Sequence, residues 1–204
     1  MVNEFNKKIG SGDFVIAADR GLKNTERLGL VPNLIVGDFD SLHYTPVGKN
    51  VIKHPVMKDD TDLLLAIKKS FEEGYKSFEI YGCSGGRPDH TFAAIQAVCY
   101  VKENGGNAVL YGEDMCMAIL QNELITFSED CQGIVSVFSY TESAEVTIKG
   151  LLYSLDKATI TQHHPLGVSN EFTGNKAEIS ITNGKALVMW TNKAGSFSIG
   201  GNTK

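Results

Sequence analysis

Cysteine is scarce in this sequence, and the few cysteines stand far apart. The 204 residues include four, none of them paired in a C-x-x-C motif: Cys83, Cys99, Cys116 and Cys131. Isolated cysteines indicate neither a structural zinc site nor a disulfide framework. We therefore expect reduced thiols, as in a cytoplasmic protein.

Long apolar runs are also lacking. The most apolar stretches, such as 109–111 and 187–190, fall far short of the ~20 residues that cross a bilayer. Residues 1–13 have neither the basic start nor the apolar core of a signal peptide. The sequence therefore predicts no membrane segment and a cytoplasmic location.

Basic residues are not in excess. Lys and Arg number 19 against 24 for Asp and Glu, which gives a formal net charge of −5. This sign disfavours a general affinity for nucleic-acid phosphates. The composition is otherwise that of a globular protein, with 42% hydrophobic and 21% charged residues. We expect one or two folded domains and no nucleic-acid partner.

Residues 1–122 alternate short apolar runs with segments of helical period, which is a βα pattern. Strands are predicted at 14–18, 34–36, 77–81 and 108–111. Helices are predicted after Gly21, over about 61–73 and from near Asp89, the last with Phe92, Ile95 and Cys99 facing inward. The pattern predicts an α/β domain with a mainly parallel sheet flanked by helices.

Residues 123–204 lose the helical period, and β-branched residues alternate with polar ones. Strands are predicted at 135–140, 145–148, 179–182, 185–191 and 196–199. Asn183-Gly184 is typical of a tight hairpin turn that needs positive φ. We expect an all-β sandwich, small enough that the first domain or a second subunit completes its core.

Acidic residues follow two of the predicted strands. Asp19 comes directly after the first strand, and Asp38 and Asp40 follow the second. The carboxyl ends of parallel strands share one edge of a sheet, where ligands of α/β folds bind. Further acids precede the predicted helix at 61–73: Asp59, Asp60 and Asp62. Because crowded carboxylates repel, we expect a cation among them, and Mg²⁺ bridging to substrate phosphates fits oxygen ligands best.

A plainer interpretation applies to each acid taken singly. An Asp after a strand is often a turn former or a helix cap. The cap of the helix at 61–73 is expected at Asp59, Asp60 or Thr61. We interpret Asp60 as a cap and leave it out of the predicted site.

A glycine-rich loop joins the predicted strand at 77–81 to the helix that begins near Asp89. Gly85 and Gly86 allow backbone N–H groups to approach an anion, and Arg87 offers a planar fork to phosphate oxygens at a helix N-terminus. The pattern is neither a Walker A motif nor the G-x-G-x-x-G of dinucleotide folds. The alternative is a plain strand-to-helix turn capped by Asp89.

Five motifs in this order resemble those of the thiamine pyrophosphokinase family: Asp19-Arg20-Gly21, Gly37-Asp38-Phe39-Asp40-Ser41, Lys58-Asp59-Asp60-Thr61-Asp62, Gly85-Gly86-Arg87-Pro88-Asp89-His90 and Gly167-Val168-Ser169-Asn170-Glu171-Phe172. The resemblance implies an α/β catalytic domain over 1–122 that binds ATP and Mg²⁺. It implies a β-sandwich over 123–204 that binds thiamine and forms a homodimer with active sites between subunits. The implied reaction moves pyrophosphate from ATP to the hydroxyl of thiamine and releases AMP.

The resemblance also implies roles for the matching positions. The catalytic carboxylates that hold Mg²⁺ and polyphosphate are Asp19, Asp38, Asp40 and Asp62. The nucleotide side comprises Ser41, Lys58, Asp59, Thr61, Gly85, Gly86, Arg87, Asp89 and His90. The thiamine side comprises Ser169 and Asn170, with Trp190 as the candidate for an aromatic ring that packs on thiamine. Trp190 lies on a predicted strand, and filling the core is its alternative role.

One position departs from the family pattern, and other functions stay open. Arg20 stands where the family often has glycine, and we expect it to add positive charge beside the polyphosphate. The 38–41 motif is also near the D-x-D-x-T/V motif of haloacid dehalogenase phosphatases, although that family's last acidic motif has no match here. A binding protein without turnover finds no support in so complete a set of residues. Transfer to another alcohol, such as a pterin, is disfavoured only by the resemblance and by the Ser169-Asn170 segment.

Overall fold

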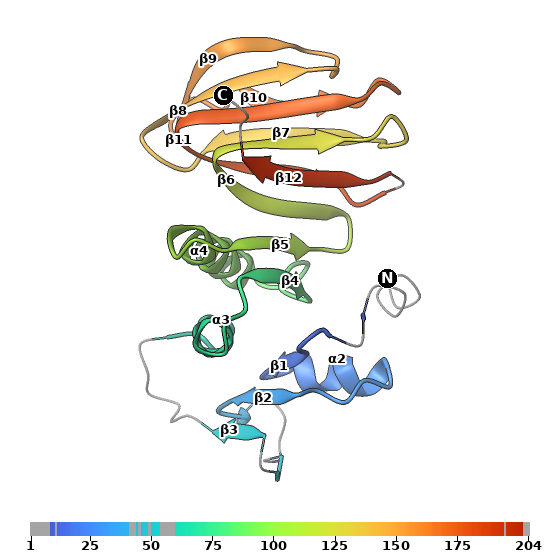
Figure 1. Cartoon of the computed structure of the whole chain (residues 1–204), viewed down its shortest axis with the longest axis vertical. Helices are drawn as coiled ribbons and strands as arrows, with labels where there is room; N and C mark the ends of the chain where they lie inside the picture. The colour runs from blue at the N-terminus through green and yellow to red at the C-terminus, as the bar shows by residue number, and fades with distance from the viewer. Residues whose placement is uncertain are drawn as a thin grey trace. The chain divides into compact units, whose positions relative to one another are not determined.

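The computed structural model describes residues 9–10, 12–40, 44, 46–48, 50–53, 60–193 and 195–201. The chain divides into two compact units, Met1–Lys76 and Ser77–Lys204. Their elements are labelled in Figure 1. Among the helices in the described ranges, none combines the length and apolar character needed to cross a membrane.

The N-terminal unit contains a parallel sheet in the order β1, β2, β3. These strands are Ile16–Ala18, Leu34–Gly37 and Val51–Lys53, and the first two confirm predicted strands. Strand β3 was not predicted, because its three residues are too short to show a period of two. Helix α2, Gly21–Arg27, connects β1 to β2, and its Leu22 joins the small core of this unit.

Helix α3, Asp62–Glu72, packs against β1 and β2 of the same unit. Its N-cap is Thr61, whose hydroxyl oxygen accepts a hydrogen bond from the Leu64 N–H at 3.2 Å. The interpretation of Asp60 as the cap is therefore wrong. The Asp60 carboxylate instead pairs with Lys68 Nζ at 2.6 Å, eight residues further along the chain.

The C-terminal unit begins with a second parallel pair, β4 (Ser77–Tyr81) and β5 (Asn107–Tyr111), joined by helix α4 (Pro88–Glu103). The α/β pattern predicted for this segment is confirmed. In the structure it belongs to the same compact unit as the β-rich part, since the division falls between Lys76 and Ser77. The domain boundary at residue 122 stays a prediction.

The β-rich part is built on two long antiparallel strands, β6 (Met115–Phe127) and β11 (Ala177–Thr191), which pair along their whole lengths. The other strands are β7 (Ile134–Ser139), β8 (Ser143–Lys149), β9 (Leu155–Thr161), β10 (Gly167–Glu171) and β12 (Phe197–Gly201). In the half of the long pair that contains 186–190 of β11, the sheet continues through β7 to β10 on one side. On the other side it continues through β5 to β4. The other half continues through β8 to β9 and, on the opposite side, to β12. The coarse prediction of an α/β part followed by a larger, mainly β part is confirmed.

Asn183 and Gly184 do not form the predicted hairpin turn. Both have positive φ, 51° and 150°, but β11 runs through them without reversing. The register with β6 shifts between Ile181 and Lys185, so the dipeptide forms a bulge opposite Asn122, which also has positive φ. The chain continues because β6 offers a partner to both halves of β11, and the bulge lets β11 exchange β8 for β7.

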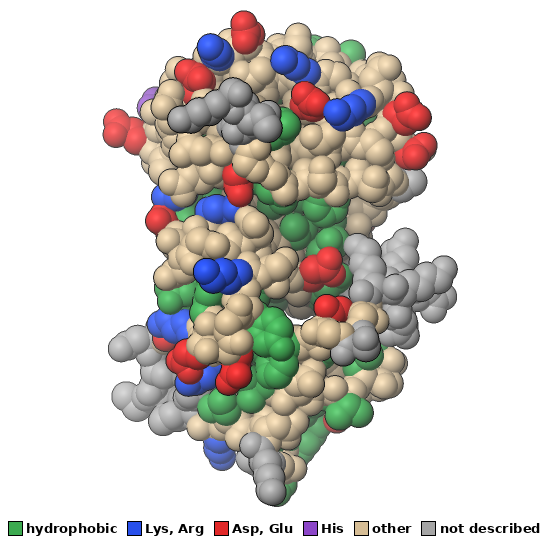
Figure 2. Space-filling model, viewed as in Figure 1, with side chains coloured by type: hydrophobic (Ala, Val, Ile, Leu, Met, Phe, Trp, Pro, Cys, Tyr) green, Lys and Arg blue, Asp and Glu red, His purple; other side chains and the backbone are tan. Residues whose placement is uncertain are grey.

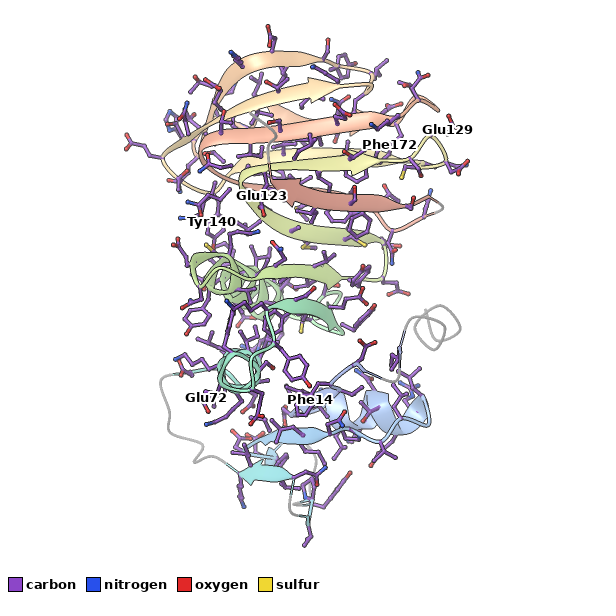
Figure 3. All side chains as sticks on the ribbon, viewed as in Figure 1. Phe14, Glu72, Glu123, Glu129, Tyr140 and Phe172 are labelled. Atoms are coloured by element: carbon purple, nitrogen blue, oxygen red, sulfur yellow. The ribbon has the colours of Figure 1, made fainter. Side chains whose placement is uncertain are left out.

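The core of the C-terminal unit contains side chains from both halves of β11, before and after the bulge. Its aromatic centre is Phe127, whose ring lies 5.1 Å from that of Phe172 (Figure 3) and 5.6 Å from that of Trp190. Helix α4 faces inward through small residues such as Ala94 and Val98. Phe92 was expected inward but is 59% exposed, because it lies on the opposite face of α4 from these residues.

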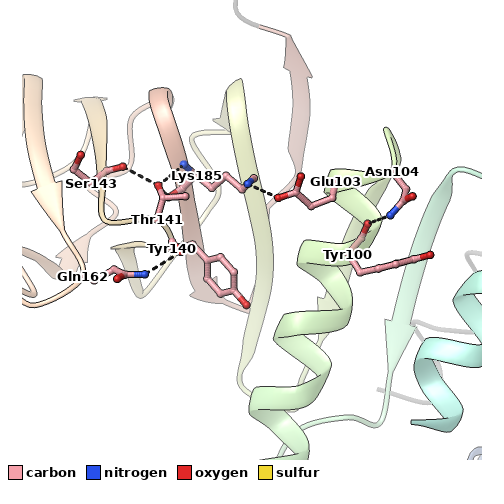
Figure 4. Close-up of polar contacts among 8 residues, drawn as sticks. All are labelled: Tyr100, Glu103, Asn104, Tyr140, Thr141, Ser143, Gln162 and Lys185. Carbon is pink, nitrogen blue, oxygen red and sulfur yellow. Dashed lines mark hydrogen bonds and ion pairs between the residues drawn. The ribbon is translucent and has the colours of Figure 1, made fainter. Parts of the chain in front are cut away.

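Polar contacts attach α4 to the β-rich part. Lys102 Nζ bonds both carboxylate oxygens of Glu123 at 2.8 Å, and the two side chains are only 9% and 16% exposed. Lys185 of β11 pairs with Glu103, while the Lys185 N–H donates to the Thr141 hydroxyl (Figure 4). On the face drawn in Figure 2, basic and acidic side chains are interspersed over the β-rich part.

Because the bulge in β11 is tightly packed, we expect one methyl group added at Gly184 to lower the free energy of unfolding strongly. A Cβ on Gly184 would overlap the Ser143 carbonyl oxygen and approach Ala144 Cα to 3.0 Å. We expect Gly184→Ala to lower the free energy of unfolding by roughly 3 kcal/mol, from overlap and backbone strain together. Urea denaturation measures it.

Gly174→Ala is the matched control for that measurement. Gly174 also has positive φ, 75°, but no described atom lies within 4 Å of an added Cβ. Its cost is therefore backbone strain alone, about 1 kcal/mol. Equal costs for the two variants would contradict the bulge geometry.

Candidate functional site

Three carboxylates converge at the carboxyl ends of β1 and β2, as the sequence predicted. One carboxylate oxygen each of Asp19, Asp38 and Asp40 lies within 4.8 Å of the other two. Asp19 and Asp38 are half-buried and Asp40 is exposed. Among the described residues, Asp62 is not part of this group and lies in the first turn of α3. The structure thus brings together three of the four predicted carboxylates.

The backbone of this acidic cluster is held in an unusual conformation. Asp19 and Phe39 both have positive φ, 45° and 64°, which costs of order 1–3 kcal/mol per residue. The Asp19 N–H donates to the Val36 carbonyl at 2.8 Å, which ties the end of β1 to β2. The Asp40 N–H donates to Asp38 Oδ1 at 3.1 Å. Phe39 is only 3% exposed, so its buried ring anchors the turn that carries Asp38 and Asp40.

Gly37 makes this arrangement possible, and the sequence analysis assigned it no role. A Cβ there would lie 3.2 Å from both Asp19 Cα and Phe39 Cε1, closer than most such contacts. Glycine therefore permits the close approach that places Asp19 beside the Asp38-Asp40 turn. Its position directly before Asp38 was the available signal.

The glycine-rich loop between β4 and α4 is built as predicted. Gly82 and Gly85 have positive φ, 77° and 85°. No described atom lies within 4 Å of a Cβ added to Gly85 or Gly86, so this part of the loop borders open space. Such a loop, leading into a helix N-terminus, exposes backbone to an approaching anion.

Arg87 and Asp89 form an ion pair at the start of α4. Arg87 Nε and Nη2 donate to the two carboxylate oxygens of Asp89 at 3.1 and 2.5 Å. The hydrogen bond from Arg87 is the largest cause that lowers the pKa of Asp89, and the same bond raises the pKa of Arg87. Arg87, not Asp89, occupies the N-cap position, so the alternative of a cap by Asp89 is wrong. Asp89 Oδ1 accepts instead from the His90 N–H at 3.0 Å.

Ser169 and Asn170 lie on β10 but have different environments. The register of β10 with β7 shifts between Gly167 and Asn170, and Ser169 in this bulge has a φ of 58° and is exposed. Asn170 is 6% exposed, and its side chain bonds the backbone of Tyr153 through both atoms: Oδ1 accepts from the N–H at 2.9 Å and Nδ2 donates to the carbonyl at 2.7 Å. Asn170 therefore braces a neighbouring segment.

Trp190 takes its alternative role in the core. It is 3% exposed, and its ring contacts Phe197 and Phe127 edge to face. Three other predicted positions, Ser41, Lys58 and Asp59, lie outside the described residues. Thr61 and His90 are exposed at the N-termini of α3 and α4.

The acidic edge of the parallel sheet in the first unit and the glycine-rich loop at a helix N-terminus in the second are each typical of proteins that bind phosphate-containing ligands. Residues 5–110 match the family model described as thiamin pyrophosphokinase, catalytic domain. Residues 122–187 match the model described as thiamin pyrophosphokinase, vitamin B1 binding domain. The chain belongs to the thiamine pyrophosphokinase family.

Relatives with known names and structures agree. The thiamine pyrophosphokinase of Bacillus subtilis is 27% identical over 182 residues, which is 85% of either chain. A crystal structure of the B. subtilis enzyme superposes with a TM-score of 0.81 at 21% identity, covering 94% of this chain and 93% of the other. A family protein from Enterococcus faecalis gives 0.76 at 25% identity, covering 89% and 90%.

The two β10 residues should respond differently to truncation. Asn170→Ala leaves the Tyr153 N–H and carbonyl without their side-chain partner, and we expect a loss of roughly 2–3 kcal/mol in unfolding free energy. Ser169→Ala removes an exposed hydroxyl, and we expect its unfolding free energy to stay within about 0.5 kcal/mol of wild type. Thermal unfolding of both variants measures this difference, and an Asn170→Ala protein as stable as wild type would contradict the bracing role.

Proposed function

We propose that the protein transfers the pyrophosphoryl group of ATP to the hydroxyl of thiamine, giving thiamine diphosphate and AMP. The observation that carries this proposal is the convergence of Asp19, Asp38 and Asp40 on the edge of a parallel sheet, in a chain that matches both models of the family. An acidic edge of this kind suits a metal–polyphosphate substrate.

The donor set at this edge fits Mg²⁺. Three carboxylate oxygens within 4.8 Å of one another need only small side-chain rotations to reach the roughly 3–4 Å separations of ligands around one such ion. Asp19, Asp38 and Asp40 would hold the ion, and Asp62 is proposed as a further ligand because it matches the family motif. When bound, Mg²⁺ neutralises charge on the polyphosphate.

The other residues of the proposed site act by binding and orientation. Phosphoryl transfer needs an in-line nucleophile and dispersal of charge more than covalent work by the protein. Arg87 presents a guanidinium to phosphate oxygens, and Gly85 and Gly86 allow close backbone approach. The acidic edge also attracts the cationic thiazolium ring of thiamine.

Residues that match the family motifs complete the proposal. On the nucleotide side they are Ser41, Lys58, Asp59, Thr61, Asp89 and His90. On the thiamine side we keep Ser169 as the residue that contacts substrate, with Asn170 positioning its surroundings. Trp190 is left with the core, because its ring is covered by Phe127 and Phe197.

The proposed organisation follows the same match. Residues 1–122 form the catalytic, ATP-binding domain, and residues 123–204 form the thiamine-binding and dimerisation domain of a cytoplasmic homodimer. The ranges of the two family models, 5–110 and 122–187, support this division. The haloacid dehalogenase alternative is set aside, because the family match also explains the glycine-rich loop.

The reaction is tested by incubating purified protein with ATP, Mg²⁺ and thiamine and resolving the products by mass. We expect AMP and thiamine diphosphate in equal amounts. Asp40→Asn removes one carboxylate from the cluster, and we expect its rate to fall about 100-fold or more. Asp60→Asn is the matched control, because Asp60 pairs with Lys68 outside the cluster, and we expect it to retain activity.

Other products would contradict specific parts of the proposal. Inorganic phosphate formed without thiamine would favour a phosphatase. AMP formed with a pterin alcohol and not with thiamine would favour a different acceptor.

Metal binding is tested without turnover. We expect Mn²⁺, used as a paramagnetic substitute, to bind the wild-type protein and to bind Asp38→Asn at least about tenfold more weakly, since one of the proposed carboxylate ligands loses its charge. Loss of the free-ion signal in electron paramagnetic resonance measures binding. Equal affinity in the two proteins would place the ion elsewhere.

A further inference from the structure

The glycine-rich loop rests on the turn between β5 and β6. A Cβ on Gly112, the first residue after β5, would overlap the Ser84 hydroxyl and come within 2.7 Å of the Met115 carbonyl oxygen. Gly112 is buried, and its N–H donates to that same carbonyl at 2.8 Å. The Ser84 side chain thus occupies the space that any other residue at position 112 would fill. Ser84 is therefore the point where the loop meets a closed, hydrogen-bonded turn.

The turn between β5 and β6 is held by the residue that follows β11. Asn192 follows the last residue of the strand, and its Nδ2 donates to the Gly112 carbonyl at 3.2 Å. Its backbone N–H donates to the Asp114 carbonyl at 2.8 Å. Two hydrogen bonds from one residue therefore fasten the turn to the central strand of the β-rich part.

The entry to the loop is fixed at the same level. Tyr81 and Tyr111 are paired in register at the ends of β4 and β5, and their rings stack at 4.8 Å with an angle of 9° between the planes. Both hydroxyls donate to the Glu79 carboxylate, at 2.6 and 3.4 Å. Burial and then the bond to Glu79 raise the pKa of Tyr81.

The loop is thus supported on one side and open on the other. Tyr81 and Ser84 rest against fixed structure, whereas Gly85 and Gly86 border open space. We propose that Asn192 and Gly112 are positioning residues that hold Ser84, and through it the Gly85-Gly86-Arg87 segment, in the conformation that receives a nucleotide phosphate. This inference rests on the proposed function for the identity of the ligand. The contacts of Asn192, Gly112 and Ser84, which we call the brace, all lie within the C-terminal unit.

The test compares Asn192→Ala with Asn104→Ala. In both residues a side-chain Nδ2 donates to a backbone carbonyl, but Asn104 bonds Tyr100 at 2.8 Å at the far end of α4 (Figure 4). Hydrogen exchange of the ligand-free protein reads the brace. We expect the amides of residues 82–87 to exchange about fivefold faster in Asn192→Ala, the ratio that corresponds to one lost hydrogen bond. Asn104→Ala should leave them unchanged.

A second readout tests positioning separately from stability. We expect the Kd for ATP with Mg²⁺ to rise about fivefold in Asn192→Ala, with the Kd for thiamine unchanged. Ser84→Gly, which removes the side chain that rests on Gly112 and leaves the core intact, should show the same pattern.

Unchanged exchange at residues 82–87 in Asn192→Ala and in Ser84→Gly would overturn the brace, whatever the enzyme's activity. Faster exchange with unchanged ATP affinity would overturn the positioning role. A wild-type protein that forms no thiamine diphosphate would defeat the proposed function instead, and the exchange experiment still decides the brace.

Discussion

The antiparallel pairing of β6 with β11 is the interaction on which most of the structure depends. The pairing runs from Met115 opposite Thr191 to Phe127 opposite Ala177. Positive-φ residues lie at the same level of the two strands, at Asn122 in β6 and at the 183–184 bulge in β11. At this level β11 exchanges β8 for β7 as its second neighbour. Several of the fully buried large side chains lie on it: Ile119, Leu120, Ile125, Phe127, Ile179 and Ile181. Burial of each such side chain contributes roughly 1.5–3 kcal/mol.

The same pair reaches the glycine-rich loop. Asn192 directly follows β11, and Gly112 lies three residues before the first residue of β6, so the turn is fastened at the ends of the two long strands. A loop with open glycines would otherwise be mobile, because glycine loses more backbone freedom on ordering than any other residue. The stable part of the fold therefore limits the conformations of the part proposed to bind phosphate.

The acidic edge of the N-terminal unit has the opposite energetic character. Asp19 and Phe39 have strained backbone, and three like charges lie close together over a core that includes Ala17, Leu22, Ile35 and Phe39. Each of these features costs stability, and such costs are common at functional sites. The ion pair with Asp89 holds the Arg87 guanidinium at the start of α4. Because this ion pair is exposed to water, replacing Asp89 by another anionic partner costs little free energy.

Local signals in the sequence determined most of the elements and the acidic site. The helix over 62–72 has its own cap and period, and the strands at 16–18 and 34–37 end at a turn that displays Asp19, Asp38 and Asp40. Tertiary structure decided the remainder. Asn183-Gly184 supplies positive φ equally well to a hairpin or to a bulge, and the presence of β6 beside both halves of β11 selected the bulge. The sequence around Asn170 does not distinguish an amide that faces a substrate from one that bonds the backbone of Tyr153. Only the folded chain brings Tyr153 to Asn170. Hydrogen-bond partners and burial of this kind come from residues distant in sequence, and periodicity and motif spacing carry no information about them.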